Sequence, residues 1–149
     1  MLRLNLPEYT FRLQKSEKGT LIFDALRKKF VVLTPEEWVR QNFIRYLIEE
    51  KKYPASLIAI ESGLKYNRLS KRCDITVYNR KGEKYMLVEC KAPEVKISQD
   101  TFNQVAAYNK GGNGNTRFLA VTNGLKHYCC ELLDGDETGY RFLKGFPDF

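Results

Sequence analysis

The chain has 149 residues, of which 43% are apolar, and its 25 basic and 18 acidic residues give a net charge of +7. This length and apolar content predict one domain, residues 1–149, that is long enough to bury a core. The positive charge favours an anionic partner such as nucleic acid, although many basic proteins bind none. The first residues contain no apolar run of the length that a signal peptide or a membrane span requires, so we expect no membrane partner.

The four cysteines lie at positions 73, 90, 129 and 130. None of them forms the C-x-x-C pair that is typical of zinc sites, so the sequence argues against a structural zinc. Two of them fall on predicted strands, where a free thiol packs as a small apolar side chain. We therefore expect a reduced protein of the cytoplasm.

Residues 8–33 have the pattern of a strand meander. Tyr9, Phe11 and Leu13 alternate with polar neighbours, and 21–23 and 30–33 are short apolar runs. We find no chemistry in this segment and expect it to cover an edge of the main sheet. We therefore separate it from a core of residues 34–149.

A helix is predicted from Thr34 to about residue 51. Thr34 at the N-cap, Pro35 at the first helical position and Glu37 at the third fit a capping box. Arg40, one turn later, can reach a phosphate or pair with Glu36 or Glu37. One face of the helix is expected to carry Val39, Phe43, Tyr46, Leu47 and Glu50.

A basic run follows the first predicted strand of the core, residues 57–64. It contains Lys65, Arg68, Lys71 and Arg72, with Tyr66 between them. One reading is a loop that contacts DNA phosphates beside a catalytic site. The other is a solvated basic loop, which is the commoner outcome for such runs.

The most informative stretch, residues 72–93, has the pattern of two strands joined by a turn at residues 80–83, with Gly82 able to take a positive φ. If the turn centres between Lys81 and Gly82 without a bulge, Asp74 lies opposite Glu89. Because side chains alternate along a strand, one face is then apolar. The other face carries Asp74, Thr76, Leu87, Glu89 and Lys91.

This second face has the composition of a magnesium site. Mg²⁺ takes hard oxygen ligands, typically one or two carboxylates with water and substrate phosphate. Asp74 and Glu89 can supply two of these oxygens and the backbone carbonyl of Cys90 a third, while Lys91 can hold the attacking water or stabilise developing negative charge. The alternative is a solvated Glu-x-Lys ion pair of little consequence.

The rest of the chain predicts a helix from Ser98 to about 110, on which Gln104 and Tyr108 share a face, and strands at 116–122 and 126–133. The helix can be an ordinary half-buried one, or Gln104 and Tyr108 can orient Lys91, a water or DNA. His127 is the only histidine, so it is not expected to bind metal or to serve in a catalytic triad. Together the elements predict an α/β fold with a mixed central β-sheet flanked by helices.

The sequence resembles the core of the PD-(D/E)XK nuclease superfamily at three places: Asp74, the series Glu89-Cys90-Lys91, and the Q-x-x-x-Y pattern of Gln104 and Tyr108. Within it, residues 34 to about 123 resemble the N-terminal nuclease domain of type I restriction enzyme R (HsdR) subunits. Cys73 stands where the superfamily motif has proline, a position that varies widely. The resemblance implies a restriction-endonuclease-like fold and an endonuclease dependent on Mg²⁺ or Mn²⁺.

The resemblance also implies roles for particular residues. Asp74 and Glu89 would bind the metal with Cys90, and Lys91 would position the water, with Gln104 and Tyr108 in support. Glu37 matches an acidic residue that related nucleases place beside the metal from their first helix. Arg40, Lys65, Arg68, Lys71 and Arg72 are the candidate DNA contacts.

Implied partners are DNA, a translocase motor and the specificity and methylation subunits of a restriction system. The alternative function is a catalytically silent DNA-binding or assembly module with the same fold. A small-molecule enzyme of another kind finds little support, because we see no nucleophile–histidine set and no dinucleotide-binding fingerprint.

Overall fold

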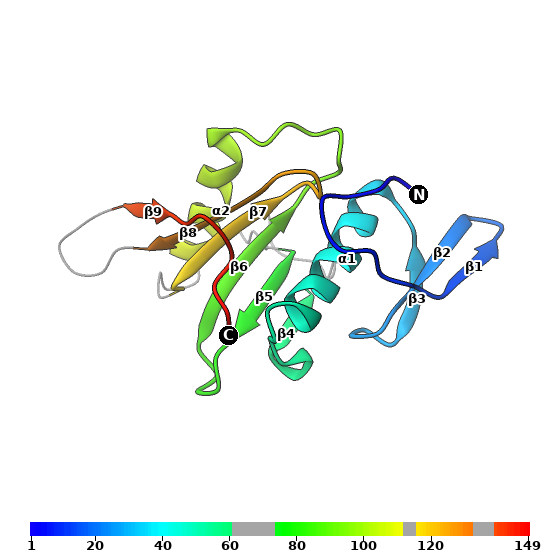
Figure 1. Ribbon diagram of the computed structural model, residues 1–149, viewed down its shortest axis with the longest axis horizontal. Coiled ribbons are helices and arrows are strands. Elements are labelled where there is room, and N and C mark those ends of the chain that lie inside the picture. Colours follow the sequence, from blue (N-terminus) through cyan, green and yellow to red (C-terminus); the bar gives the residue numbers. More distant parts are fainter. Residues whose placement is uncertain (61–73, 112–115, 133–138) are drawn as a thin grey trace.

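The computed structural model describes residues 1–60, 74–111, 116–132 and 139–149. Within these ranges the chain forms a six-stranded mixed sheet, a separate three-stranded sheet and two α-helices (Figure 1). The main sheet has the order β4-β5-β6-β7-β8-β9, in which β6 and β7 are parallel and the other pairs antiparallel. Its strands are β4 Ile58–Ile60, β5 Ile75–Tyr78, β6 Lys84–Cys90, β7 Phe118–Thr122, β8 His127–Leu132 and β9 Tyr140–Phe142.

The helices cover opposite faces of this sheet, as an α/β fold with a mixed, flanked sheet requires. Helix α1 (Pro35–Glu49) buries Val39, Phe43 and Leu47 in one core, and helix α2 (Gln99–Gly111) buries Phe102 and Val105 in the other. The α1 core includes Ile75, Val77, Met86, Val88, Phe118, Ala120 and Cys129, and the α2 core includes Leu87, Leu119, Val121 and Cys130. The expected fold class is confirmed.

The β5–β6 hairpin pairs as the sequence predicts, although its turn differs. Ile75 lies opposite Val88 and Val77 opposite Met86, but Tyr78 lies opposite Lys84, so Tyr85 is an extra, bulged residue. The predicted register is therefore confirmed, although the condition on which it was argued, a hairpin without a bulge, does not hold. The turn is centred on Lys81 rather than between Lys81 and Gly82, because the Asn79 N–H donates to the Glu83 carbonyl oxygen (2.8 Å), and the bulge restores the predicted pairing.

Helix α1 begins as predicted and ends earlier. The Thr34 hydroxyl accepts from the Glu37 N–H at 3.0 Å, which is half of the predicted capping box. The Glu37 carboxylate turns to other side chains, and the Thr34 N–H donates to the Val32 carbonyl oxygen instead. Glu50 is the exposed C-cap rather than part of the buried face. The strand expected at 57–64 begins as β4, and residues 61–64 lie outside the described ranges.

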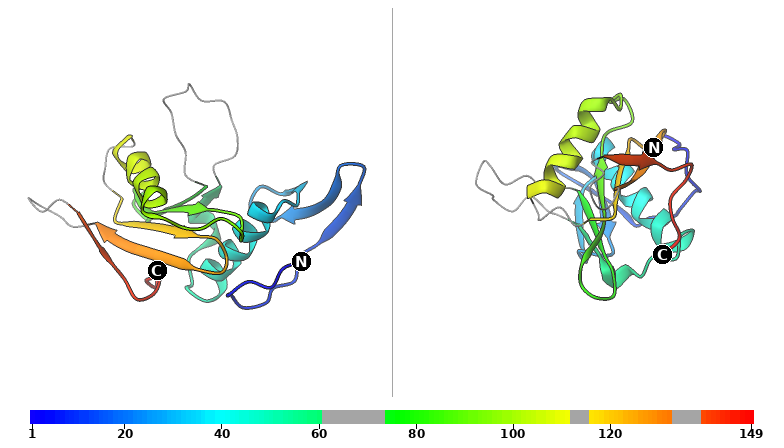
Figure 2. Two further views of the ribbon diagram at one scale, coloured as in Figure 1. Left: turned by 90° about the horizontal axis from the view of Figure 1, so that it is seen from above. Right: turned by 90° about the vertical axis from the view of Figure 1, so that its left-hand side faces the viewer.

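The predicted meander forms a sheet of its own. Strands β1 (Leu13–Ser16), β2 (Gly19–Asp24) and β3 (Lys29–Val32) pair in order and antiparallel. Figures 1 and 2 show this sheet beyond α1, on the side away from the main sheet. The expectation that it covers an edge of the main sheet is therefore wrong.

Both ends of the chain pack on the α1 side. Leu4 is buried in the α1 core, and the Asn5 N–H donates to the Gly124 carbonyl oxygen at 2.8 Å. Phe146 joins the same core, and the Tyr53 hydroxyl donates to the Pro147 carbonyl oxygen at 2.7 Å. No helix among the described residues is long and apolar enough to cross a membrane.

His127 is tied into this region by hydrogen bonds. Its Nδ1 lies 2.7 Å from the Thr122 hydroxyl and its Nε2 lies 2.9 Å from the Asn5 carbonyl oxygen. The ring stacks on Phe43 with the centroids 6.0 Å apart, and burial lowers its pKa. Both ring nitrogens are thus occupied by hydrogen bonds within the protein.

Two glycines allow the cost of a positive φ to be separated from the cost of close packing. Gly82 (φ +82) has open space where a Cβ would stand, whereas a Cβ on Gly124 (φ +84) would lie 2.7 Å from Leu4 Cδ2 and 3.1 Å from Val39 Cγ2. We expect Gly82→Ala to cost about 1–2 kcal/mol, and Gly124→Ala about 1–3 kcal/mol more through overpacking. Urea denaturation of both variants measures the difference, and equal losses would contradict the packing of residues 2–5 against this turn.

Candidate metal centre

Asp74 stands directly before β5 and is held by two hydrogen bonds. Its Oδ2 accepts from the backbone N–H of Cys90 at 2.7 Å, and its Oδ1 accepts from Arg40 Nη2 at 2.8 Å. Continuing the pairing of Ile75 with Val88 by one residue sets Asp74 opposite Glu89. The first bond ties the carboxylate to the end of β6, and the second ties it to α1.

Glu89 is the buried member of the predicted pair. It is 6% exposed, and Lys91 Nζ lies 3.2 Å from its Oε2. Burial, followed by the neighbouring Asp74 carboxylate, raises the pKa of Glu89 to about 8, which the Lys91 ammonium only partly offsets. Two carboxylates therefore share a poorly solvated corner where both are costly to ionise together.

Arg40 is the cation that joins α1 to this corner. Besides Asp74, its guanidinium donates to Glu37 Oε1 at 2.6 Å and to Glu36 Oε1 at 3.0 Å. Burial opposes its charge, but Asp74 and then Glu37 raise the pKa of the guanidinium overall. The pairing with Glu36 and Glu37 is one of the two alternatives that the sequence leaves open, and the contact to Asp74 is new.

Arg40 Nε is buried and has no hydrogen-bond partner among the described residues. Such a group costs free energy unless something else satisfies it. Burial, and then Asp74, also raise the pKa of Glu36, whose carboxylate flanks the same guanidinium.

Glu37 lies one step further from Asp74, within a buried ion-pair network. Its carboxylate accepts from Arg40, from Arg27 Nη2 at 3.1 and 3.2 Å, and from Gln41 Nε2 at 3.0 Å. Arg27 Nε also donates to Asp24 Oδ2, and Gln41 Nε2 donates to the same oxygen at 2.9 Å. Glu37 therefore contacts the arginine that holds Asp74.

Sequence reasoning missed Asp24, Arg27 and Gln41. Asp24 is fully buried at the end of β2, where its Oδ1 accepts from the N–H groups of Leu26 and Arg27 at 2.9 Å each. A lone acid at the end of the apolar run Leu-Ile-Phe is a signal that could have found it. Residues 8–33, in which the sequence indicated no functional side chains, thus supply Asp24 and Arg27 to the ion-pair network.

The charges of this cluster suit a divalent cation. Among the residues that the structure describes, five carboxylates face three cations when every group is ionised, which is a surplus of two negative charges; the basic residues of 65–72 lie outside this count. The acids are Asp24, Glu36, Glu37, Asp74 and Glu89, and the cations are Arg27, Arg40 and Lys91. Burial is the first cause of the raised pKa of Glu89, and the neighbouring Asp74 carboxylate is the second, so the two acids of the corner also disfavour each other's charge.

The donor set is small but fits Mg²⁺. Among the residues that the structure describes, no group of three or more His, Cys, Asp or Glu side chains is arranged to hold a metal ion. Two carboxylates are nevertheless the usual protein contribution to a magnesium site, with waters and substrate phosphate completing the octahedron. The Cys90 side chain is buried in the α1 core, so only its backbone could contribute.

Of the remaining predicted site residues, the structure describes only the side chain of Gln104. Gln104 is exposed on α2, and no hydrogen bond joins it to Glu89 or Lys91 in the described part of the chain. The side chain of Tyr108 lies outside the described residues, as do Lys65, Arg68, Lys71 and Arg72. Their roles stay predictions.

The pKa of Glu89 predicts a pH dependence of stability in metal-free protein. The unfolded chain releases this proton near the ordinary pKa of 4.5, whereas the native state keeps it until about pH 8. The contribution of the neutral side chain is therefore complete below about pH 4.5 and is lost as pH rises through about 8.

With a chelator present, we expect the free energy of unfolding of the wild type to fall, relative to Glu89→Gln, by up to about 1.4 kcal/mol per pH unit. Urea denaturation at several values between about pH 5 and pH 9 measures this. Parallel curves for the two proteins would contradict the raised pKa.

Comparison with known proteins identifies the family of the chain. Neither a search of curated proteins nor a search of solved structures gave a match. The family model described as type I restriction enzyme R protein N terminus matches residues 35–147, from the first residue of α1 to beyond β9. This match covers most of the chain and includes Asp74, Glu89 and Lys91. The chain therefore belongs to the family of type I restriction enzyme R protein N-terminal domains.

Proposed function

We propose that the protein is a Mg²⁺-dependent endonuclease domain that hydrolyses phosphodiester bonds in DNA. The observation that carries this proposal is the pairing of Asp74 and Glu89 at one corner of the sheet, with Lys91 Nζ 3.2 Å from Glu89. The described residues of the cluster to which this corner belongs carry a surplus of two negative charges, which attracts a divalent cation, and Lys91 can act on a phosphate that arrives with the cation.

Asp74 and Glu89 would hold the metal, with the backbone of Cys90 beside them. A bound Mg²⁺ or Mn²⁺ would act as a Lewis acid on the phosphate and lower the pKa of a coordinated water. The protein contributes the placement of the two carboxylates. Asp74 is fixed through the Cys90 N–H and Arg40, and each of its oxygens keeps a lone pair for a further ligand.

Lys91 is proposed as the catalytic cation. Lys91 follows Glu89 by two residues in the chain, and its side chain is only partly exposed. From there the ammonium can donate to the attacking water or to a phosphate oxygen, which stabilises the negative charge that develops in the transition state. Such preorganised donors are worth about 3–4 kcal/mol each.

Arg40 and Glu37 are proposed to act on the position of Asp74 rather than on the substrate. Arg40 holds Asp74 Oδ1, and Glu37 holds Arg40 from the other side. The other roles implied by the resemblance remain part of the proposal: support of the site by Gln104 and Tyr108, and contacts to DNA by Lys65, Arg68, Lys71 and Arg72.

The alternative is a catalytically silent DNA-binding or assembly module. One observation favours it, because both oxygens of Asp74 already accept a hydrogen bond and one of these comes from a half-buried cation. A metal ion would then have to compete with Arg40 for the aspartate. Partners such as a translocase motor and the specificity and methylation subunits belong to either version of the proposal.

A plasmid-nicking assay separates the two. We expect the purified protein with Mg²⁺ or Mn²⁺ to nick supercoiled plasmid, and Lys91→Ala to lose at least about a hundredfold in rate because the developing charge loses its donor. Lys81→Ala is the matched control, because Lys81 is an exposed lysine in the turn of the same hairpin. It should nick as the wild type does.

Equal nicking by wild type and Lys91→Ala would remove the catalytic assignment and point to a contaminating nuclease. A protein that binds DNA with a steep salt dependence but nicks it with neither metal would establish the silent module instead.

A further inference from the structure

The three-stranded sheet carries a large share of the protein's positive charge. We call residues 12–33 the arm; it contains β1, β2 and β3 and lies before the residues that the family model matches. The arm has six basic and two acidic residues, a net charge of +4 out of the chain's +7. Asp24, one of the two acids, is fully buried. The exposed charge of the arm is therefore almost wholly positive.

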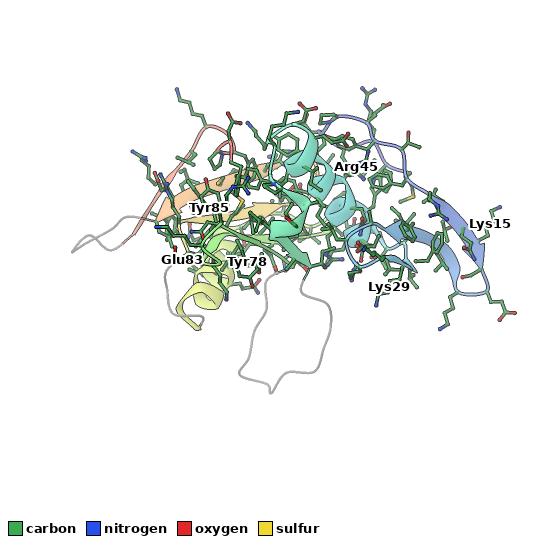
Figure 3. The ribbon with its side chains drawn as sticks, turned by 90° about the horizontal axis from the view of Figure 1, so that it is seen from below. Lys15, Lys29, Arg45, Tyr78, Glu83 and Tyr85 are labelled. Atoms are coloured by element: carbon green, nitrogen blue, oxygen red, sulfur yellow. The ribbon has the colours of Figure 1, made fainter. Side chains whose placement is uncertain are left out.

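The arm projects away from the body of the protein. In Figure 2, seen from above, β1 and β2 extend beyond α1, and in Figure 3 the Lys15 and Lys29 side chains point outward from the arm. All four residues of β1 are exposed. This surface is open to a partner along the length of the strand.

The lysines of the arm are free of ion pairs. Lys15, Lys18, Lys28 and Lys29 are all exposed, and none of them forms a salt bridge among the described residues. Glu17 is the one exposed acid between them. Arg27, in contrast, is taken up by Asp24 and Glu37 and adds nothing to the outer charge.

The lysines are also not what holds the arm together. Ile22 is fully buried, Phe23 and Phe30 meet edge to face with centroids 5.2 Å apart, and the Arg12 guanidinium stacks 4.7 Å from the centre of the Phe23 ring. Such aromatic and cation–π contacts stabilise the sheet independently of its outer side chains. Exposed lysines with no structural task can serve for binding.

We propose that the arm binds the phosphate backbone of duplex DNA beside the stretch held at the candidate metal centre. This rests on the proposed function. The root of the arm is joined to that centre through Asp24, Arg27 and Glu37. Six residues of β2 span about 17–20 Å at roughly 3.3 Å per residue, so the tip reaches phosphates about five base pairs further along the duplex.

The contact is electrostatic and independent of sequence. Lysine contacts to phosphates release condensed counterions, so each one steepens the dependence of log K on log salt by about 0.9 for B-DNA. The arm therefore adds affinity and orientation, and it selects no base.

The test is fluorescence anisotropy with a 24-base-pair duplex in chelator, where no cleavage occurs, at several salt concentrations. The arm variant combines Lys15→Gln, Lys18→Gln, Lys28→Asn and Lys29→Gln. Asparagine is chosen at position 28 because Lys28 has φ +56, which asparagine tolerates.

The control variant combines Lys52→Asn, Lys81→Gln, Lys84→Gln and Lys144→Gln. It removes the same number of charges away from the arm, and Lys52 matches Lys28 with φ +64. Circular dichroism and thermal unfolding establish that both variants are folded.

We expect the arm variant to have a slope of log K against log salt that is shallower by about 2–4 than that of the wild type, and at least about tenfold weaker binding at roughly 0.1 M salt. The control variant should change the slope by less than about one. An unchanged arm variant, or equal changes in both, overturns the proposal. Loss of binding to phosphatidylserine vesicles by the arm variant, with an unaltered DNA slope, overturns it in favour of a membrane surface.

The outcome is independent of catalysis. A nicking assay at saturating DNA should give the arm variant the same maximal rate as the wild type. A wild type that binds the duplex through the arm and never nicks would refute the nuclease while leaving the arm contact intact.

Discussion

The clamp on Asp74 is the interaction on which the rest of the site depends. One carboxylate oxygen accepts from the Cys90 N–H at the end of β6, and the other accepts from the Arg40 guanidinium of α1. Charge-assisted bonds of this kind are short and directional, so they fix the aspartate opposite Glu89. Without them, Asp74 would be a solvated residue at the start of a strand, free to turn away.

The clamp also explains why the site extends into the N-terminal sheet. A buried arginine is stable only when its charge is paired, and Arg40 shares its charge among Asp74, Glu36 and Glu37. Glu37 in turn needs Arg27, which needs Asp24 at the end of β2. The corner of the main sheet and the root of the arm are therefore one electrostatic unit, although the residues involved are spread from position 24 to position 91.

The local parts of this arrangement are predictable from the sequence. The alternation in the β5–β6 hairpin gave the correct pairing and both faces, because burial of Ile75, Val77, Met86 and Val88 fixes the register. The bulge at Tyr85 was not predicted, because the shifted turn and the bulge compensate each other and leave the alternation of apolar and polar residues unchanged. The long-range contacts were not predicted either. Nothing in the spacing of Asp24, Arg27 and Glu37 indicates that they meet, because their contact depends on how the N-terminal sheet packs against α1.

The central claim is that Asp74 and Glu89 share one divalent cation. A crystal soaked in Mn²⁺ and measured at the manganese absorption edge tests it directly. We expect a single anomalous peak within coordinating distance, about 2.0–2.3 Å, of a carboxylate oxygen from each residue. A peak elsewhere, or none at saturating Mn²⁺ with Arg40 still on Asp74 Oδ1, would contradict it.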